Sequence, residues 1–185
     1  MATLVNQILG LLTIAGDIVV VGLVVLLVLQ GVNERASHQT GAISNLVANN
    51  AILFSLIVVV LATAGSLFYS EIAGYEPCKL CWFQRIFMYP QVVLLSLALW
   101  KRDSNISLYS LWLSGIGAVI AGYHYLLQIG VTSGVPCAAV GYSASCSQRF
   151  VLQHGYITIP MMAFTAFLMI AVFMVIQRKI VLPKR

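Results

Sequence analysis

The residues in this chain whose type and spacing suggest chemistry are four cysteines: Cys78, Cys81, Cys137 and Cys146. The first two form a Cys-x-x-Cys motif, in which one thiol commonly has a lowered pKa and reacts as a thiolate. Eight residues, including Gly141, separate the other two. We therefore expect a pliable loop whose exposed disulfide a partner thiol could attack. Two such pairs predict thiol–disulfide exchange.

Two sources of positive charge are predicted beside the first pair. Arg85 follows Cys81 by four residues, which is one turn along the same helical face. The helix predicted to begin near residue 80 also presents its positive end to both thiols. A cation and a helix amino terminus both favour a thiolate. The pattern therefore indicates a reactive pair at Cys78 and Cys81, whereas Arg85 without them would indicate a lipid headgroup anchor.

Other readings of the four cysteines stay open at this point. They could bind zinc or copper, which would make the chain a cysteine-ligated metal-binding membrane protein. The Cys-x-x-Cys half fits a zinc site, but the second pair is spaced at nine residues, where such sites use three or four. They could also form structural disulfides in a non-catalytic scaffold. Spacing and placement favour redox chemistry, for which we expect no metal ligands.

The composition places these cysteines in a membrane protein. Hydrophobic residues make up 61% of the 185 residues and charged residues only 8%, whereas soluble domains are about one quarter charged. The sequence predicts an all-α membrane protein with five spans, because a span needs about 20 apolar residues. Asp17 falls near the middle of the first span, where we expect it either to face a neighbouring helix or to mark a helix start after a short interfacial segment. The predicted spans cover roughly residues 8–29, 51–69, 80–100, 106–129 and 157–176.

The distribution of Lys and Arg predicts the topology. Residues 31–50, 101–105 and 177–185 share one side and hold seven of the ten basic residues, which predicts the cytoplasmic side. Residues 31–50 are rich in Asn, Ser, Gly and Thr, and we expect them to form a loop. The cysteines then lie outside, where disulfides persist, and the amino terminus lies outside as well. No basic stretch with interleaved aromatics suggests a nucleic-acid partner.

Residues 76–90, EPCKLCWFQRIFMYP, resemble the signature of the DsbB/BdbC disulfide bond formation proteins. Residues 155–160, GYITIP, followed by an apolar helix, look like the last span of the BdbC branch. The resemblance covers roughly residues 50–180. It implies a four-helix transmembrane bundle with two outer cysteine loops in residues 50–185. Residues 1–49 are then an extra amino-terminal transmembrane segment with its cytoplasmic connector.

The resemblance also implies an activity. Such proteins are multi-pass enzymes of the bacterial cytoplasmic membrane that reoxidise a DsbA-like thioredoxin-fold protein outside the cytoplasm. They pass the electrons to a membrane quinone, either ubiquinone or menaquinone. The carboxyl terminus would be cytoplasmic, and the partners would be the thiol protein, the quinone and membrane lipid.

Residue roles carry over by position. Cys137 and Cys146 match the pair that exchanges with the thiol partner, Cys137 being the site of the mixed disulfide. Cys78 and Cys81 match the quinone-linked pair. Three residues match quinone contacts: Cys81, Arg85 and His124. From the residues alone, His124 on an apolar helix would equally suit a hydrogen-bonded bundle position. Two residues near Arg85 in the sequence have other predicted roles. Gln84 is predicted to shape the helix start, and Tyr89 to lie in an interfacial aromatic belt.

Overall fold

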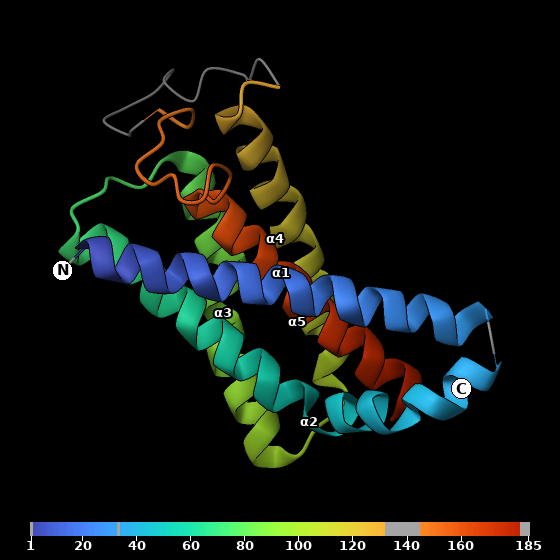
Figure 1. Cartoon of the computed structure of the whole chain (residues 1–185). Coiled ribbons are helices and arrows are strands. Elements are labelled where there is room, and N and C mark those ends of the chain that lie inside the picture. Colours follow the sequence, from blue (N-terminus) through green and yellow to red (C-terminus); the bar gives the residue numbers. More distant parts are fainter. Residues whose placement is uncertain (1, 33, 132–144, 182–185) are drawn as a thin grey trace.

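A computed structural model describes residues 2–32, 34–131 and 145–181 of the chain, and these residues are helical apart from connectors and one isolated bridge. Five helices are long and apolar enough to span a membrane, which confirms the predicted all-α membrane fold. A π-helical turn, η1, continues the second of them (Figure 1). The elements are α1 (Ala2–Val32), α2 (Glu34–Leu67), η1 (Phe68–Ile72), α3 (Lys79–Lys101), α4 (Ile106–Gln128) and α5 (Ile159–Ile180).

The predicted loop at residues 31–50 is wrong, because α2 already begins at Glu34. Polar residues of low helix propensity suggested a loop, but propensity is a weak prior that packing overrides. Ala48 and Ala51 are fully buried in a cluster that includes Phe173 of α5. Small side chains let the helices approach closely, so this part of α2 is held by contact with α5.

A buried polar clamp joins α3 to α4. Gln91 is fully buried, and its side-chain oxygen accepts hydrogen bonds from Ser110 (2.7 Å) and Ser114 (3.1 Å). Its amide nitrogen donates to the Phe87 carbonyl at 2.9 Å. Polar groups in a membrane interior must find such partners within the protein. The clamp therefore sets the register of the two helices that carry the candidate site.

Helices α4 and α5 approach closely at Gly117. A Cβ atom built there would overlap the ring of Phe167, which is fully buried in the main core. Only glycine leaves room for that ring, as is common where membrane helices pack tightly. The contact brings α5 against α4, opposite α3.

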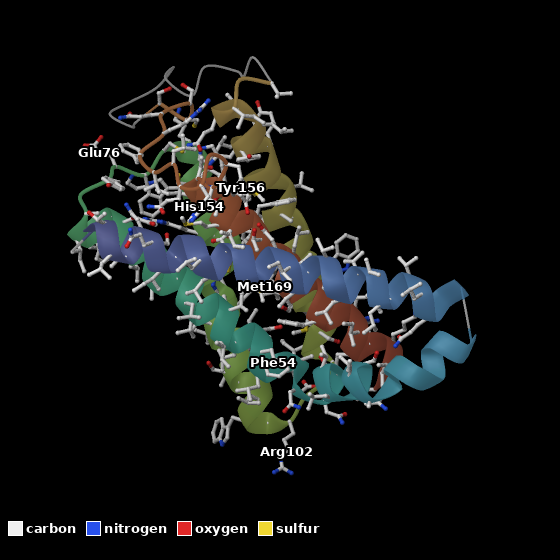
Figure 2. All side chains as sticks on the ribbon, in the orientation of Figure 1. Phe54, Glu76, Arg102, His154, Tyr156 and Met169 are labelled. Carbon is white, nitrogen blue, oxygen red and sulfur yellow. The ribbon has the colours of Figure 1, made fainter. Side chains whose placement is uncertain are left out.

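Helix α1 lies across α5 and α2 (Figure 1). Asp17 accepts hydrogen bonds from Thr165 of α5 (2.6 Å) and from the Tyr156 hydroxyl (3.2 Å). Figure 2 shows Tyr156 and His154 beside α1, near its amino-terminal half. The prediction that Asp17 faces a neighbouring helix is confirmed. The amino-terminal end of α1 lies at the same end of the bundle as the connector that carries Cys78.

Candidate active site

The Cys-x-x-Cys motif caps the amino terminus of α3. Cys78 is the N-cap residue, with an extended backbone, and its sulfur accepts a hydrogen bond from the Cys81 backbone N–H at 3.4 Å. The two sulfurs are free and lie 3.1 Å apart. Cys78 is buried, whereas Cys81 is partly exposed. The motif therefore places both sulfurs at the positive end of the helix, as the sequence predicted.

The surroundings of Cys78 favour its thiolate. The hydrogen bond with the Cys81 side chain lowers the pKa of Cys78 from 9.0 to about 4. Burial opposes this shift, while His124 and the Cys81 backbone N–H add to it. A thiolate is the nucleophile in disulfide exchange. In the reduced pair, Cys78 is therefore the sulfur that carries the charge at neutral pH, although the sequence had directed attention to Cys81.

His124 connects Cys78 to the segment that carries Cys146. The imidazole is buried, and its Nε2 lies 3.6 Å from the Cys78 sulfur and 3.1 Å from the Cys146 carbonyl oxygen. Its Nδ1 lies 2.9 Å from the amide nitrogen of Gln84. An amide nitrogen only donates, so Nδ1 accepts and the proton lies on Nε2. That N–H is directed at the thiolate and the carbonyl, and His124 lies outside the set of residues that line the cavity described below.

The structure describes only one of the two cysteines in the second pair. Cys146 is buried and disulfide-bonded, whereas Cys137 lies outside the described residues. The segment after Cys146 is attached to the end of α4 by two hydrogen bonds. Gln128 donates to the Gln148 carbonyl at 2.9 Å, and Arg149 donates to the Gln128 carbonyl at 2.7 Å. A cation on the last helix carbonyls is a favourable cap, and it holds this segment over Cys78.

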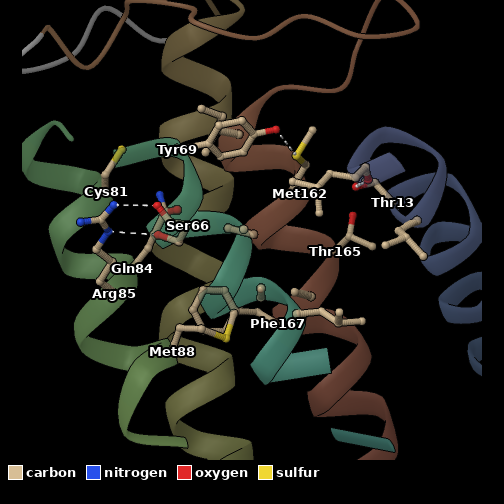
Figure 3. Close-up of a pocket in the computed structure, with 18 of the residues that line it drawn as sticks. Thr13, Ser66, Tyr69, Cys81, Gln84, Arg85, Met88, Met162, Thr165 and Phe167 are labelled. Carbon is tan, nitrogen blue, oxygen red and sulfur yellow. Dashed lines mark hydrogen bonds between the residues drawn. The ribbon is translucent and has the colours of Figure 1, made fainter. Parts of the chain in front are cut away.

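A cavity of about 330 Å³ lies on the other side of the motif, and its lining includes Cys81 but not Cys78. Helices α1, α2, α3 and α5 all contribute to its walls. Figure 3 shows Cys81 and Arg85 on one side of the cavity and Thr13 on the other. Most of the lining is apolar, and its charged residues are Arg85 and Glu76. A largely apolar cavity with a few convergent polar groups is typical of a small-molecule site.

Arg85 is the cation of this cavity. Its guanidinium donates to the Ser66 hydroxyl (3.0 Å) and to the Ser66 carbonyl (3.1 Å), as Figure 3 shows. It also lies over the Trp82 ring, at 5.1 Å from the centroid, and Tyr89 donates to Ser66 at 3.1 Å. Within the described residues, Arg85 has no carboxylate partner. A positioned cation that is not held in an ion pair can stabilise negative charge on a ligand.

An aromatic stack borders the same cavity. The rings of Tyr69 and Tyr75 are stacked with centroids 5.8 Å apart, and Tyr75 stacks on Phe150 at 5.0 Å. All three line the cavity. Offset stacking of aromatic rings adds stability beyond the area it buries. The stack thus holds the connector before Cys78 against the segment after Cys146.

Sequence reasoning missed the functional contacts of three residues. Gln84 was expected to shape the helix start and Tyr89 to lie in an interfacial belt, yet they contact His124 and Ser66. The four-residue spacing of Arg85 and Tyr89 could have indicated a shared face. Ser66 lies in an apolar run of α2 and had no signal of its own, since its role depends on which helix packs beside α3.

The same residues offer a set of metal ligands. The sulfurs of Cys78 and Cys81 and a ring nitrogen of His124 all lie within 4.8 Å of one another. Two thiolates and one imidazole are suitable ligands for zinc, which commonly takes four in a tetrahedral arrangement. The geometry therefore keeps the metal-binding alternative open for a test.

Comparison with known proteins agrees with the architecture. The profile of the family described as "Disulfide bond formation protein DsbB" matches residues 48–177. "Disulfide bond formation protein C" of Bacillus subtilis is 42% identical over 130 residues, which are 68% of this chain and 92% of that protein. "Probable disulfide formation protein C" of Halalkalibacterium halodurans is 45% identical over 124 residues, 65% of this chain and 88% of that protein. No solved structure matches the chain significantly.

Proposed function

Because the chain belongs to the DsbB family and is therefore a multi-pass membrane thiol–disulfide oxidoreductase, we propose that it reoxidises a DsbA-like thioredoxin-fold protein and delivers the electrons to a membrane quinone. One observation carries the proposal: the two sulfurs of the motif face different surroundings. Cys78 contacts His124 beneath the Cys146 segment, whereas Cys81 lines the cavity. Such an arrangement can accept electrons on one side and deliver them on the other.

Exchange with the partner comes first. A thiolate of the partner attacks Cys137, the Cys137–Cys146 bond breaks, and a mixed disulfide forms. The second partner thiol then attacks the mixed disulfide. The partner leaves oxidised, and Cys137 and Cys146 are left as two thiols that hold the two electrons. The role of Cys137 rests on the family resemblance, because this residue lies outside the described part of the chain.

The electrons then pass to the motif. A thiolate of the reduced loop pair attacks Cys78, the Cys78–Cys81 bond breaks, and Cys81 leaves as a thiolate while Cys78 is joined to the loop in a mixed disulfide. The second loop thiolate then attacks the loop sulfur of this mixed disulfide, so that the loop disulfide forms again and Cys78 leaves as a thiolate. A good leaving thiol has a low pKa, and Cys78 has one of about 4. His124 donates to the thiolate that leaves. Gln84 holds the tautomer of His124 that can make this donation.

The cavity suits a quinone, whose ring is flat, whose carbonyl oxygens accept hydrogen bonds and whose side chain is apolar. When bound, a quinone takes up two electrons and two protons and leaves as quinol, and this redox chemistry is the cofactor's own. Cys81 supplies the sulfur on the cavity wall, and Arg85 supplies the charge and the donors. The apolar lining excludes water from this part of the site.

We propose a bacterial cytoplasmic membrane as the location, with the cysteines on its outer side and the carboxyl terminus in the cytoplasm. The site lies at one end of the bundle, together with the amino-terminal end of α1. Arg102 lies at the opposite end, as Figure 2 shows. An excess of Lys and Arg on one side predicts the cytoplasmic face.

The test uses the full chain purified in detergent, a reduced thioredoxin-fold dithiol protein and a soluble quinone analogue. We expect one quinone to be consumed for each partner disulfide formed. Quinone absorbance measures the quinone consumed, and thiol titration measures the disulfide formed. The proposal fails if partner oxidation runs at the same rate without quinone in the absence of oxygen.

A metal-binding function is the second candidate, supported by the three ligand atoms within 4.8 Å. It predicts about one equivalent of bound metal in the purified protein, held by the thiolates of Cys78 and Cys81 with no disulfide between them. The oxidoreductase predicts disulfides that a reduced dithiol protein can open. Metal analysis and thiol counts before and after reduction separate the two functions, and a non-catalytic scaffold predicts disulfides that the dithiol protein leaves intact.

A further inference from the structure

Helix α1 is an addition to the family architecture that contributes to the cavity. The family match begins at residue 48, so α1 lies wholly outside it. Six residues of α1 nevertheless line the cavity: Leu9, Leu12, Thr13, Ala15, Gly16 and Val19. Their spacing of three to four residues defines one face of the helix. One helical face of α1 is therefore a wall of the cavity.

Close packing holds this wall in place. A Cβ atom built on Gly16 would lie 2.9 Å from Thr165 and 3.0 Å from the sulfur of Met169. One residue further on, Asp17 accepts the 2.6 Å hydrogen bond from Thr165. Glycine permits the close approach, and the partly buried hydrogen bond sets the rotation of α1 about its own axis. Thr13 is also buried, and its hydroxyl donates to the Leu9 carbonyl at 2.8 Å.

The wall lies across the cavity from the reactive end. Figure 3 shows Thr13 on α1 facing the side that carries Cys81 and Arg85. The α1 wall presents mainly aliphatic groups. The polar ring of a quinone belongs with Arg85, since a cation and N–H donors recognise its oxygens. The aliphatic face then suits the hydrocarbon side chain.

We propose that α1 binds the hydrocarbon side chain of the quinone and so determines the affinity for side-chain-bearing quinones. This inference rests on the proposed quinone function. It makes Leu12 and Gly16 specificity-determining residues for the ligand and Asp17 a positioning residue. It also assigns a role to the part of the chain that the family match leaves out.

The experiment compares Gly16→Val with Gly22→Val in the full chain. Gly22 is on the same helix, and a Cβ atom built there meets nothing within 4 Å, so both variants add the same side chain. The probes are one naphthoquinone with an isoprenoid side chain and the same ring without it. Binding is measured by quenching of tryptophan fluorescence, since Trp82 lies beside Arg85. The KM and kcat for each quinone are measured alongside.

We expect Gly16→Val to weaken binding of the side-chain-bearing quinone about tenfold, as overpacking displaces the wall. The ring without a side chain should bind within about twofold of the unaltered protein, because Arg85 is untouched. Gly22→Val should change neither. The KM for the side-chain-bearing quinone should rise with kcat unchanged, whereas a general loss of structure would lower kcat for both quinones.

A second pair of variants tests the same inference if Gly16→Val does not fold. Leu12 lines the cavity, whereas Leu11 is 60% exposed and is not among the lining residues. Leu12→Ala should weaken binding of the side-chain-bearing quinone and Leu11→Ala should not. Equal behaviour within both pairs, or equal losses for both quinones, overturns the inference. If the unaltered protein binds neither quinone, the proposed function fails instead.

Discussion

Cys78 and Cys81 are separated by only two residues in sequence but belong to two different regions of the molecule. Cys78 is 3% exposed and lies among polar groups: the imidazole of His124, the Cys81 backbone N–H and the start of α3. Cys81 lines a mostly apolar cavity beside Arg85. The first region stabilises a charged sulfur, and the second provides space for a ligand.

The difference separates two demands on one motif. Exchange with a disulfide needs a sulfur that leaves readily as a thiolate. Reduction of a quinone needs a sulfur beside a water-excluding pocket with a cation for the developing charge. The helix N-terminus places both sulfurs 3.1 Å apart, yet directs them to separate neighbours. If this separation is functional, substitutions on the two sides must give different defects.

The largest effect is expected from Cys81→Ser. Removing the sulfur that lines the cavity should lower quinone reduction by about a thousandfold or more, because the reacting atom is lost. Quinone absorbance with excess reduced partner measures the rate. Cys81→Ser should still form a disulfide-linked complex with the partner, seen on a non-reducing gel. Undiminished turnover in Cys81→Ser would remove the basis of the comparison.

Arg85→Met should follow, with a loss of about a hundredfold in kcat/KM for quinone, since a preorganised charge is typically worth that much. Arg85→Lys is the control, because it keeps the charge but loses the fork that contacts Ser66 twice. We expect it to recover part of the activity. Thiol exchange with the partner should be unaffected in both variants, measured as the first turnover without quinone. A slowed exchange step in Arg85→Met would contradict the division into two regions.

On the other side of the motif, His124→Phe keeps a ring and removes the N–H donor near Cys78. The pKa of Cys78 should rise from about 4, and exchange should slow about tenfold, because hydrogen bonds to charged groups contribute about 1.5–3 kcal/mol. Thiolate absorbance at 240 nm against pH measures the pKa, with Cys137 and Cys146 replaced by serine. Gln84→Leu should shift the pKa in the same direction by less. A pKa unchanged in both variants would show that His124 does not stabilise the thiolate.

The same pKa predicts how stability depends on pH. The folded pKa of Cys78 lies below its ordinary value of 9.0. The thiolate therefore contributes stability that is fully present above about pH 9 and is lost as the pH falls toward 4. The melting temperature of the reduced protein should decrease over this range more than that of Cys78→Ala. Parallel melting curves for the two proteins would contradict this.

Tyr89→Phe should have the smallest effect. It removes one hydrogen bond to Ser66 while keeping the ring beside Arg85. A neutral hydrogen bond contributes about 1 kcal/mol, so we expect roughly a threefold rise in the KM for quinone. Steady-state kinetics with the quinone varied measures it. Tyr125→Phe on α4 serves as a matched control and should leave the KM unchanged.

Much of the predicted fold rested on local sequence patterns. Apolar runs predicted all five spans, because length and composition alone decide whether a helix can cross a bilayer. The apolar run from about residue 80 predicted a helix that presents its positive end to the Cys-x-x-Cys pair, and the structure places both cysteines at the start of α3. The predicted loop at residues 31–50 failed because Ala48 and Ala51 pack against Phe173. Such a contact with a distant residue leaves no mark in the local composition.

By itself, the sequence determined the membrane class, the spans and the position of the Cys-x-x-Cys pair at a helix start, because each follows from residue type and near-neighbour spacing. Only the tertiary structure decided which sulfur faces which region, since that depends on how α4 brings His124 to Cys78 and how α2 brings Ser66 to Arg85. The tertiary structure also decided that α1 lies along the cavity. Its contact through Gly16 and Asp17 joins residues nearly 150 positions apart, and close packing of membrane helices establishes such contacts only once the bundle forms.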